Sequence, residues 1–225
     1  MRALRDSSLS FALRSLGSTA ALLLACSAWA QEKTANETAA DVVATAPALA
    51  AQFKITPGAQ GNLIRFESKA PMESFDGSTK TVSGTLAIDP AAIADSLDLF
   101  VEVDLASFDT GVKLRNQHMC ENHFQTEEFP KSTFRSGKVL KGAGTSLLDC
   151  KEHEILVEGV LDLHGVKKTI QAPIKLTYAP QPGSVRMSTT FMVKLSDYQI
   201  PRPQMLFMKL SEDQKVTATL VAAKG

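Results

Sequence analysis

Three side chains that can bind a metal ion lie close together in the sequence: His118, Cys120 and His123. On an α-helix each residue turns by ~100°, which lets Cys120 and His123 share a face while His118 points away from it. No carboxylate and histidine four residues apart complete the tetrahedral set that zinc prefers. The sequence therefore predicts no metal site, and it predicts instead that Arg115 and His118 anchor a helix to the body of the domain.

Residues that could catalyse a reaction by nucleophilic attack or proton transfer do not form a recognised motif. The sequence holds no Gly-x-Ser-x-Gly elbow, no glycine-rich phosphate loop and no His-Glu-x-x-His pair. His164 lies in a predicted turn, and the neighbouring acids Glu127 and Glu128 are typical of a solvated helix end. We therefore predict that the protein is not an enzyme and uses no cofactor.

Two cysteines, Cys120 and Cys150, lie within the domain and remain there after any N-terminal processing. In an oxidising compartment a free pair of thiols would be unusual. A disulfide between them would close a loop of ~30 residues and stabilise the fold by ~3 to 4 kcal/mol in the chain-entropy account. We predict this disulfide, which would join the helix to a strand connection.

The N-terminal segment is typical of a secretory signal peptide, residues 1–30. Basic residues are followed by the apolar run 16–25 and by Ala28-Trp29-Ala30, a small-x-small pattern that predicts cleavage between Ala30 and Gln31. An alternative is a bacterial lipobox at residues 23–26, in which Cys26 would be acylated. The first alternative predicts a soluble periplasmic or secreted protein, and the second predicts a membrane-anchored lipoprotein.

The residues that follow divide into a flexible linker, 31–50, and one domain, 51–224. The linker consists mainly of small and polar residues, which bury too little apolar surface to offset the entropy of ordering. Removal of residues 1–30 takes away three Arg and one Asp, which leaves a formal net charge of −2. This balance argues against a nucleic-acid partner. No later apolar run has the ~20 residues of a transmembrane helix, and a homodimer is compatible with the sequence.

Within the domain, apolar residues recur at every second position. The clearest runs are 97–105, 155–163, 170–178 and 185–195, with weaker copies at 82–88, 134–140 and 216–222. This spacing places one apolar face on each strand. Because short turns such as 164–167 and 181–183 connect consecutive strands, neighbouring strands should be antiparallel. Such strands bury their apolar faces in a two-sheet sandwich or in a closed barrel.

One segment, residues 114–129, interrupts the strand pattern. It is rich in Glu, Gln, His, Asn and Met and is followed by Pro130. The residue before a proline disfavours the helical conformation, so we predict a short helix that ends at Phe129 and covers one end of the barrel. The sequence thus predicts an all-β fold with one short helix.

Several separated motifs resemble those of the YceI-like family. They are the residues 104–111, Arg115-Asn116-Gln117-His118-Met119, the residues 128–134, and the strand-turn-strand segment 157–168. The likeness spans roughly residues 52–224, and it departs from the family pattern after Lys69, at Asn116 and over residues 196–203. The resemblance implies an exported, antiparallel lipocalin-like β-barrel of about eight strands. It also implies that the protein holds a long-chain isoprenoid, a quinone-type molecule or another neutral lipid.

A barrel of about eight strands can enclose one small ligand or be filled by its own side chains. The strand residues predicted to face the barrel interior are aliphatic and uncharged, which suits an apolar ligand. We predict that its wall includes Val101, Leu161, Leu163, Ala172, Ile174 and Phe191. The alternative function is that of an envelope protein-binding or stress-response module, with the apolar run Met205–Met208 as an exposed patch.

Overall fold

The computed structural model describes residues 50–69, 74–94, 97–205 and 208–225, with backbone alone at 204, 205 and 208. The predicted signal peptide, Cys26, the cleavage site at Ala30 and Gln31, and nearly all of the predicted linker lie outside these residues. The apolar run Met205–Met208 likewise has no described side chains. Among the helices within these ranges, none is long and apolar enough to cross a bilayer.

Most of the domain is β-strand, as the two-residue alternation predicts. The first strands along the chain are β1 (Ala51–Ile55), β2 (Leu63–Lys69), β3 (Ser74–Thr79), β4 (Val82–Ile88), β5 (Asp98–Asp104) and β6 (Lys131–Lys141). The later strands are β7 (His153–Leu163), β8 (Val166–Ala179), β9 (Ser184–Lys194) and β12 (Asp213–Lys224). Two short strands, β10 (Gln204–Met205) and β11 (Met208–Lys209), pair separately with each other.

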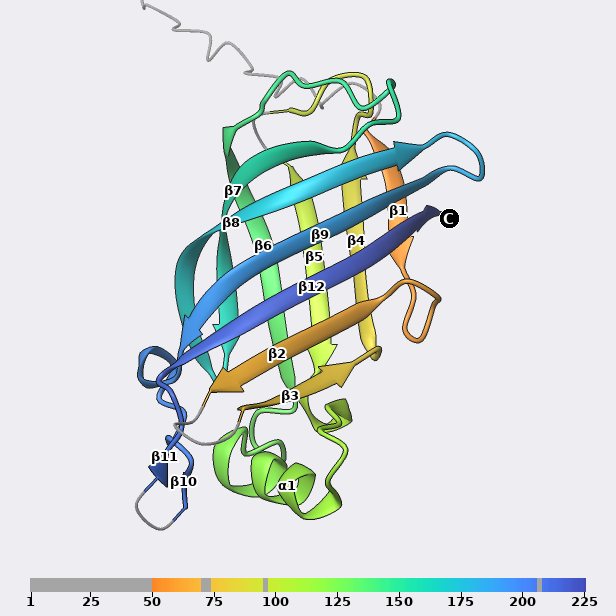
Figure 1. Cartoon of the computed structure of the whole chain (residues 1–225). Coiled ribbons are helices and arrows are strands. Elements are labelled where there is room, and N and C mark those ends of the chain that lie inside the picture. Colours follow the sequence, from red (N-terminus) through yellow and green to blue (C-terminus); the bar gives the residue numbers. More distant parts are fainter. Residues whose placement is uncertain (1–49, 70–73, 95–96, 206–207) are drawn as a thin grey trace, which may run out of the picture. The chain divides into compact units, whose positions relative to one another are not determined.

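Eight of the strands close into an antiparallel, lipocalin-like barrel (Figure 1). Their order is β1-β4-β5-β6-β7-β8-β9-β12, and β12 pairs back onto β1. Strands β2 and β3 are not part of this closed ring and extend the sheet beyond β12. The predicted fold class is therefore confirmed, and the sandwich alternative is wrong because the sheet closes on itself.

The junction between β12 and its two neighbours on one side forms a seam in the barrel. β1 pairs with β12 at Ala223 and Lys224, whereas β2 pairs with β12 over residues 215–219. Between these pairings, the backbone N–H of Val221 donates to Oδ1 of Asn62 at 2.7 Å. Nδ2 of Asn62 donates in turn to the carbonyl oxygen of Thr56 at 2.9 Å. The Asn62 side chain, 1% exposed, thus replaces strand pairing where β12 changes partner.

The helical segment covers one end of the barrel, here called the helix end (Figure 1). It consists of α1 (Lys113–His118) and one π-helical turn, η2 (Met119–His123). The predicted C-terminal limit at Phe129 is wrong, because the chain leaves the helix at Phe124 and Gln125 adopts a left-handed conformation with φ of 48°. Short 3-10 turns, η1 (Leu105–Ser107) and η3 (Leu195–Tyr198), lie where β5 and β9 end.

The opposite end of the barrel, here called the loop end, is filled by side chains. The inward residues Ile55, Leu86, Ile155, Leu176 and Val185 are at most 1% exposed. Ile93 and Leu147, from the connections that follow β4 and β6, close this end at 2% and 0% exposure. We call this part of the barrel the filled half. Its complete burial is typical of a packed protein core.

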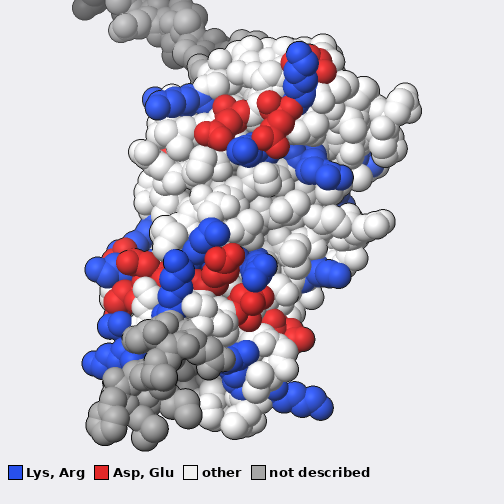
Figure 2. All heavy atoms as spheres, in the orientation of Figure 1, with Lys and Arg blue, Asp and Glu red and all other residues white. Residues whose placement is uncertain are grey.

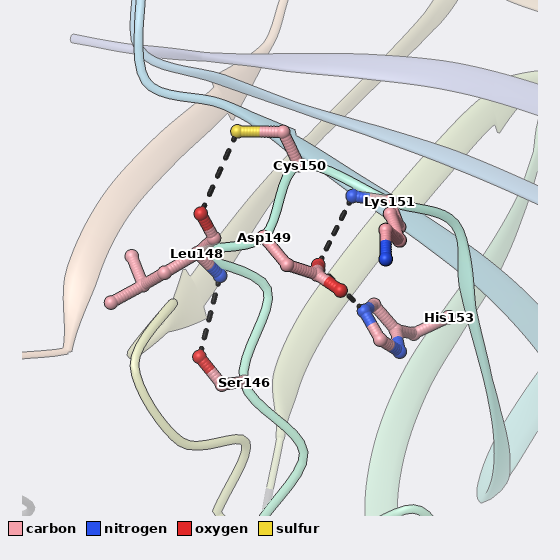
Figure 3. A network of polar contacts seen from close by, with 6 residues as sticks. All are labelled: Ser146, Leu148, Asp149, Cys150, Lys151 and His153. Atoms are coloured by element: carbon pink, nitrogen blue, oxygen red, sulfur yellow. Dashed lines mark hydrogen bonds and ion pairs between the residues drawn. The ribbon is translucent and has the colours of Figure 1, made fainter.

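The predicted disulfide between Cys120 and Cys150 is wrong, because both thiols are free. Cys120 lies in η2 at the helix end, whereas Cys150 lies in the connection after β6 at the loop end, where its thiol is near the carbonyl oxygen of Leu148 (Figure 3). The eleven residues of β6 separate these ends. A strand of this length extends ~33 Å, and a disulfide requires Cα atoms within ~7 Å.

Candidate ligand cavity

Between the filled half and the helix end, the barrel encloses a cavity of about 190 Å³. We call this part of the barrel the hollow half. The cavity wall is formed by the inward faces of β2, β5, β6, β7, β8, β9 and β12, with contributions from the segments after β5, α1 and β9. Several inward side chains here are partly exposed, in contrast to those of the filled half, because the cavity lies beside them. They include Phe66, Phe134, Leu163, Ile170, Phe191 and Val216.

The six residues predicted from the sequence all lie on the cavity wall: Val101, Leu161, Leu163, Ala172, Ile174 and Phe191. Strand pairing brings them together from β5, β7, β8 and β9, although they are spread over about ninety residues of sequence. Their role in ligand binding stays a prediction.

Aromatic side chains that the strand pattern did not predict form the helix-end part of the wall. Phe108 follows η1 and Phe124 follows η2, and their ring centroids are 6.1 Å apart. Phe66 of β2 lies 5.5 Å from Phe108, centroid to centroid. Because Phe108 and Phe124 lie outside the strands, two-residue periodicity could not identify them. No other pattern in the sequence indicated that Phe108 and Phe124 line the cavity.

Two glycines determine where two of the cavity phenylalanines lie. A Cβ atom on Gly77 would come within 2.4 Å of the Phe66 ring, its cross-strand partner. A Cβ atom on Gly159 would come within 2.5 Å of the Phe134 ring. Each ring therefore packs directly over a backbone that has no side chain. A larger residue at either glycine would force the ring to move.

The cavity wall is mostly apolar. Among the described residues, those that line it carry no titratable side chain. Its polar members are Ser132, Thr133, Ser188, Thr189 and Gln214. Ser132 donates to the carbonyl oxygen of Asp162 at 2.8 Å, and Nε2 of Gln214 donates to the carbonyl oxygen of Ser211 at 2.7 Å. The wall thus offers an uncharged molecule a large apolar contact surface and no group suited to acid-base or nucleophilic chemistry.

The charged residues lie on the outside of the barrel. Figure 2 shows basic and acidic side chains intermixed on the visible face. Several of them form exposed ion pairs, such as Arg65–Asp76 at 3.1 Å and Lys168–Asp197 at 3.2 Å. Pairs of this kind contribute little stability, ~0 to 1 kcal/mol each. They keep the outer surface polar around an apolar interior.

Arg115, predicted to anchor the helix, makes several contacts at the helix end, and its anchoring role stays a prediction. Its Nε donates to Oγ1 of Thr110 at 2.9 Å, and its NH2 group donates to the Thr110 carbonyl oxygen at 2.8 Å. The guanidinium also lies 4.6 Å from the centre of the Phe75 ring on β3. The structure does not support the same role for His118, which is exposed on the helix, whereas the adjacent Met119 is buried in the core.

Two other histidines, His123 and His164, form hydrogen bonds that connect separate segments at the helix end. Nδ1 of His123 lies 2.8 Å from the carbonyl oxygen of Pro201, beyond η3. Burial lowers the pKa of His123 despite this hydrogen bond, which acts in the opposite direction. The ring of His164 is 7% exposed and lies between the Tyr198 carbonyl oxygen, at 3.1 Å, and Oε1 of Gln125, at 2.8 Å. The turn position of His164 was predicted correctly, but its burial was not visible in the sequence.

No three His, Cys, Asp or Glu side chains of the described residues are grouped in a way that could hold a metal ion. Cys120 and His123 lie in the same π-helical turn. The hydrogen bond of His123 to Pro201 accounts for one of its ring nitrogens. The polar network at the loop end, in which Nε2 of His153 lies 2.8 Å from Oδ1 of Asp149, is a surface hydrogen-bond network (Figure 3).

The comparisons with known proteins agree with this architecture. The YceI-like domain family matches residues 37–222. The fold is similar to that of BcnA from Burkholderia cenocepacia, with a TM-score of 0.61 and 20% identity, covering 72% of this chain and 96% of that one. No curated protein matches the sequence.

Two further solved structures share the fold. One is described as a polyisoprenoid binding domain from Saccharophagus degradans implicated in plant cell wall breakdown, with a TM-score of 0.59, 16% identity, and coverage of 79% of this chain and 100% of that one. The other is a YceI protein from Campylobacter jejuni, with a TM-score of 0.53, 21% identity, and coverage of 66% and 84%. At these identities the likeness shows the fold alone.

Proposed function

The chain belongs to the YceI-like domain family, and from that premise we propose that it binds a neutral, isoprenoid-type lipid inside its barrel and does not catalyse a reaction. The observation that carries the proposal is the cavity of about 190 Å³ whose described lining holds no titratable side chain. Eight-stranded barrels are just wide enough to hold one small ligand. The description of the Saccharophagus degradans neighbour as a polyisoprenoid binding domain supports the same ligand class.

The physical basis of such binding would be burial of apolar surface. Transfer of one methylene group from water to an apolar environment contributes ~0.8 kcal/mol. A charged ligand would lose its hydration without gaining a partner, because the described wall offers no opposite charge. The wall therefore favours an uncharged chain over a fatty acid anion, and it favours binding over chemistry.

The lipid proposal predicts that the protein retains a neutral lipid through purification. Native mass spectrometry of the protein should show a mass increment, and organic extraction should release the molecule for identification. As a control, the delipidated protein should take up added quinones or polyprenols. If the protein carries no lipid and takes up none of the quinones, polyprenols and fatty acids offered, the lipid proposal is wrong and the protein-binding alternative replaces it.

We also propose that the protein acts outside the cytoplasm, in the periplasm or after secretion. The basic start, the apolar run 16–25 and the pattern Ala28-Trp29-Ala30 support export by a signal peptide. The intact mass of the protein from its native envelope should correspond to a chain that begins at Gln31. A diacylglycerol-modified chain that begins at Cys26 would contradict this and would make the protein a membrane-anchored lipoprotein.

A further inference from the structure

The barrel interior is divided into two parts that differ in packing. In the hollow half, wall residues such as Phe134 and Phe191 are partly exposed to the cavity. In the filled half, Leu86, Leu176 and Val185 have no exposed surface at all. A chain that enters the cavity therefore meets a packed core before it reaches the loop end.

The floor of the cavity is formed where the two halves meet. Met187 of β9 and Leu220 of β12 pair with each other there, and both line the cavity at 3% and 5% exposure. On the side of Met187 away from the cavity, Leu176 and Val185 are completely buried. Close packing of this kind does not yield without a large cost, because it already has the density of a crystal.

The depth of the cavity follows from the strand positions on its wall. The lining extends from Met187 to Val193 on β9 and from Leu220 to Gln214 on β12. At ~3.3 Å per residue and a strand tilt of ~40°, this distance corresponds to ~15 Å along the barrel axis. The hydrocarbon core of a bilayer is ~30 Å thick and holds two opposed chains, so one membrane acyl chain also reaches ~15 Å.

The width of the cavity can increase more easily than its depth. An engineered apolar cavity of ~150 Å³ holds one benzene molecule, so a cavity of about 190 Å³ is narrow for a lipid chain. The half-buried rings of Phe66, Phe134 and Phe191 line its sides and have space beside them. Rotation of these rings can widen the cavity, whereas no such space exists behind Met187.

The polar end of a ligand has a place at the helix end. Gln214, the largest polar side chain of the wall, lies opposite Val193, at the last lining position of β9 and β12 toward the helix end. The loop end is closed by Ile93 and Leu147. A ligand with one polar terminus would therefore lie with its apolar end against Met187 and its polar end near Gln214.

From these observations we propose that the cavity is a blind pocket, closed at the loop end, which buries one apolar chain over about the length of a membrane acyl chain, so that further chain length adds no affinity. This inference rests on the proposed function and makes it more specific. The limit is set by Met187 and the packed residues behind it, and the phenylalanines of the side wall adapt to the bound chain.

The experiment measures the affinity of the delipidated protein for prenyl alcohols that increase in length by one isoprene unit, from about ten to about forty carbons. Affinity should rise about tenfold or more with each added unit while the chain remains inside the pocket. It should stop rising at roughly fifteen to twenty carbons, where the chain reaches the floor.

Substitution of the floor tests which residue sets the limit. Met187→Ala should shift the length limit upward by about one unit, because it removes most of a side chain from the floor. Met192→Ala is the matched control, since Met192 is on the same strand but is 58% exposed on the outside of the barrel.

Three outcomes would overturn the proposal. Affinity that continues to rise up to the longest chain would show a through-going tunnel. An unchanged limit in Met187→Ala, in a variant that still binds the shorter alcohols, would remove Met187 from the floor. Failure of every chain length to bind would refute the proposed function itself, and with it this inference.

Discussion

Ala172→Phe is expected to give a folded protein that no longer retains lipid. Ala172 lies on the cavity wall, on β8, with 3% exposure. A cavity of ~150 Å³ holds a benzene ring, so the added phenyl group should fit into the available 190 Å³ and occupy most of it. Overpacking of a core costs ~1 to 3 kcal/mol, and the cost should be at the lower end here because the ring enters empty space.

The comparison for this variant is Ala223→Phe, which adds the same ring to an exposed position of β12. Native mass spectrometry should show bound lipid in the unmodified protein and in Ala223→Phe, and none in Ala172→Phe. Circular dichroism should be the same for all three proteins. Retention of the full amount of lipid by a folded Ala172→Phe protein would place the ligand outside the cavity.

Leu86→Ala is expected to produce the largest loss of stability, ~3 to 5 kcal/mol in the free energy of unfolding. Leu86 is completely buried in the filled half, where it packs among strands β1, β4 and β5. Its truncation leaves an empty volume that the surrounding side chains can fill only in part. Urea unfolding, followed by fluorescence or circular dichroism, measures the effect. Lipid retention should persist under native conditions, because Leu86 does not line the cavity.

The matched substitution in the hollow half is Leu161→Ala. Leu161 is also mostly buried, at 7% exposure, but it borders the cavity and therefore has fewer atoms in contact with its side chain. We expect it to cost ~2 to 3 kcal/mol, at the lower end of the range for this substitution. Equal losses for Leu86→Ala and Leu161→Ala would contradict the division of the barrel into a filled and a hollow half.

The strands and much of the cavity wall could be predicted from the sequence because alternation reports directly on which face of a strand is buried. Leu161 and Leu163 lie on the same face of β7, and Ala172 and Ile174 lie on the same face of β8. The sequence could not show which members of one face border a cavity. Ile155 belongs to the same alternating set as Leu161, yet it lies in the filled half, because the barrel closes tightly around it.

The remaining differences arise from contacts between distant segments. The helix ends before Phe124 rather than at the proline signal, because Phe124 packs on the cavity wall and Gln125 contacts His164 of the β7–β8 turn. The pairing of Cys120 with Cys150 failed because their separation depends on the length and direction of β6. The number of residues between the two cysteines carries no information on the length or the direction of β6.

The seam at β12 has a consequence for the solubility of the protein. Strand edges with unpaired N–H and C=O groups can recruit strands of other molecules, which leads to aggregation or to domain swapping. A closed ring avoids such edges, but the change of partner from β2 to β1 would leave one edge open at Val221. Asn62 covers it by using its side-chain amide as a substitute strand. A single buried asparagine thereby protects the barrel against intermolecular pairing at the point where β1 and β2 diverge along β12.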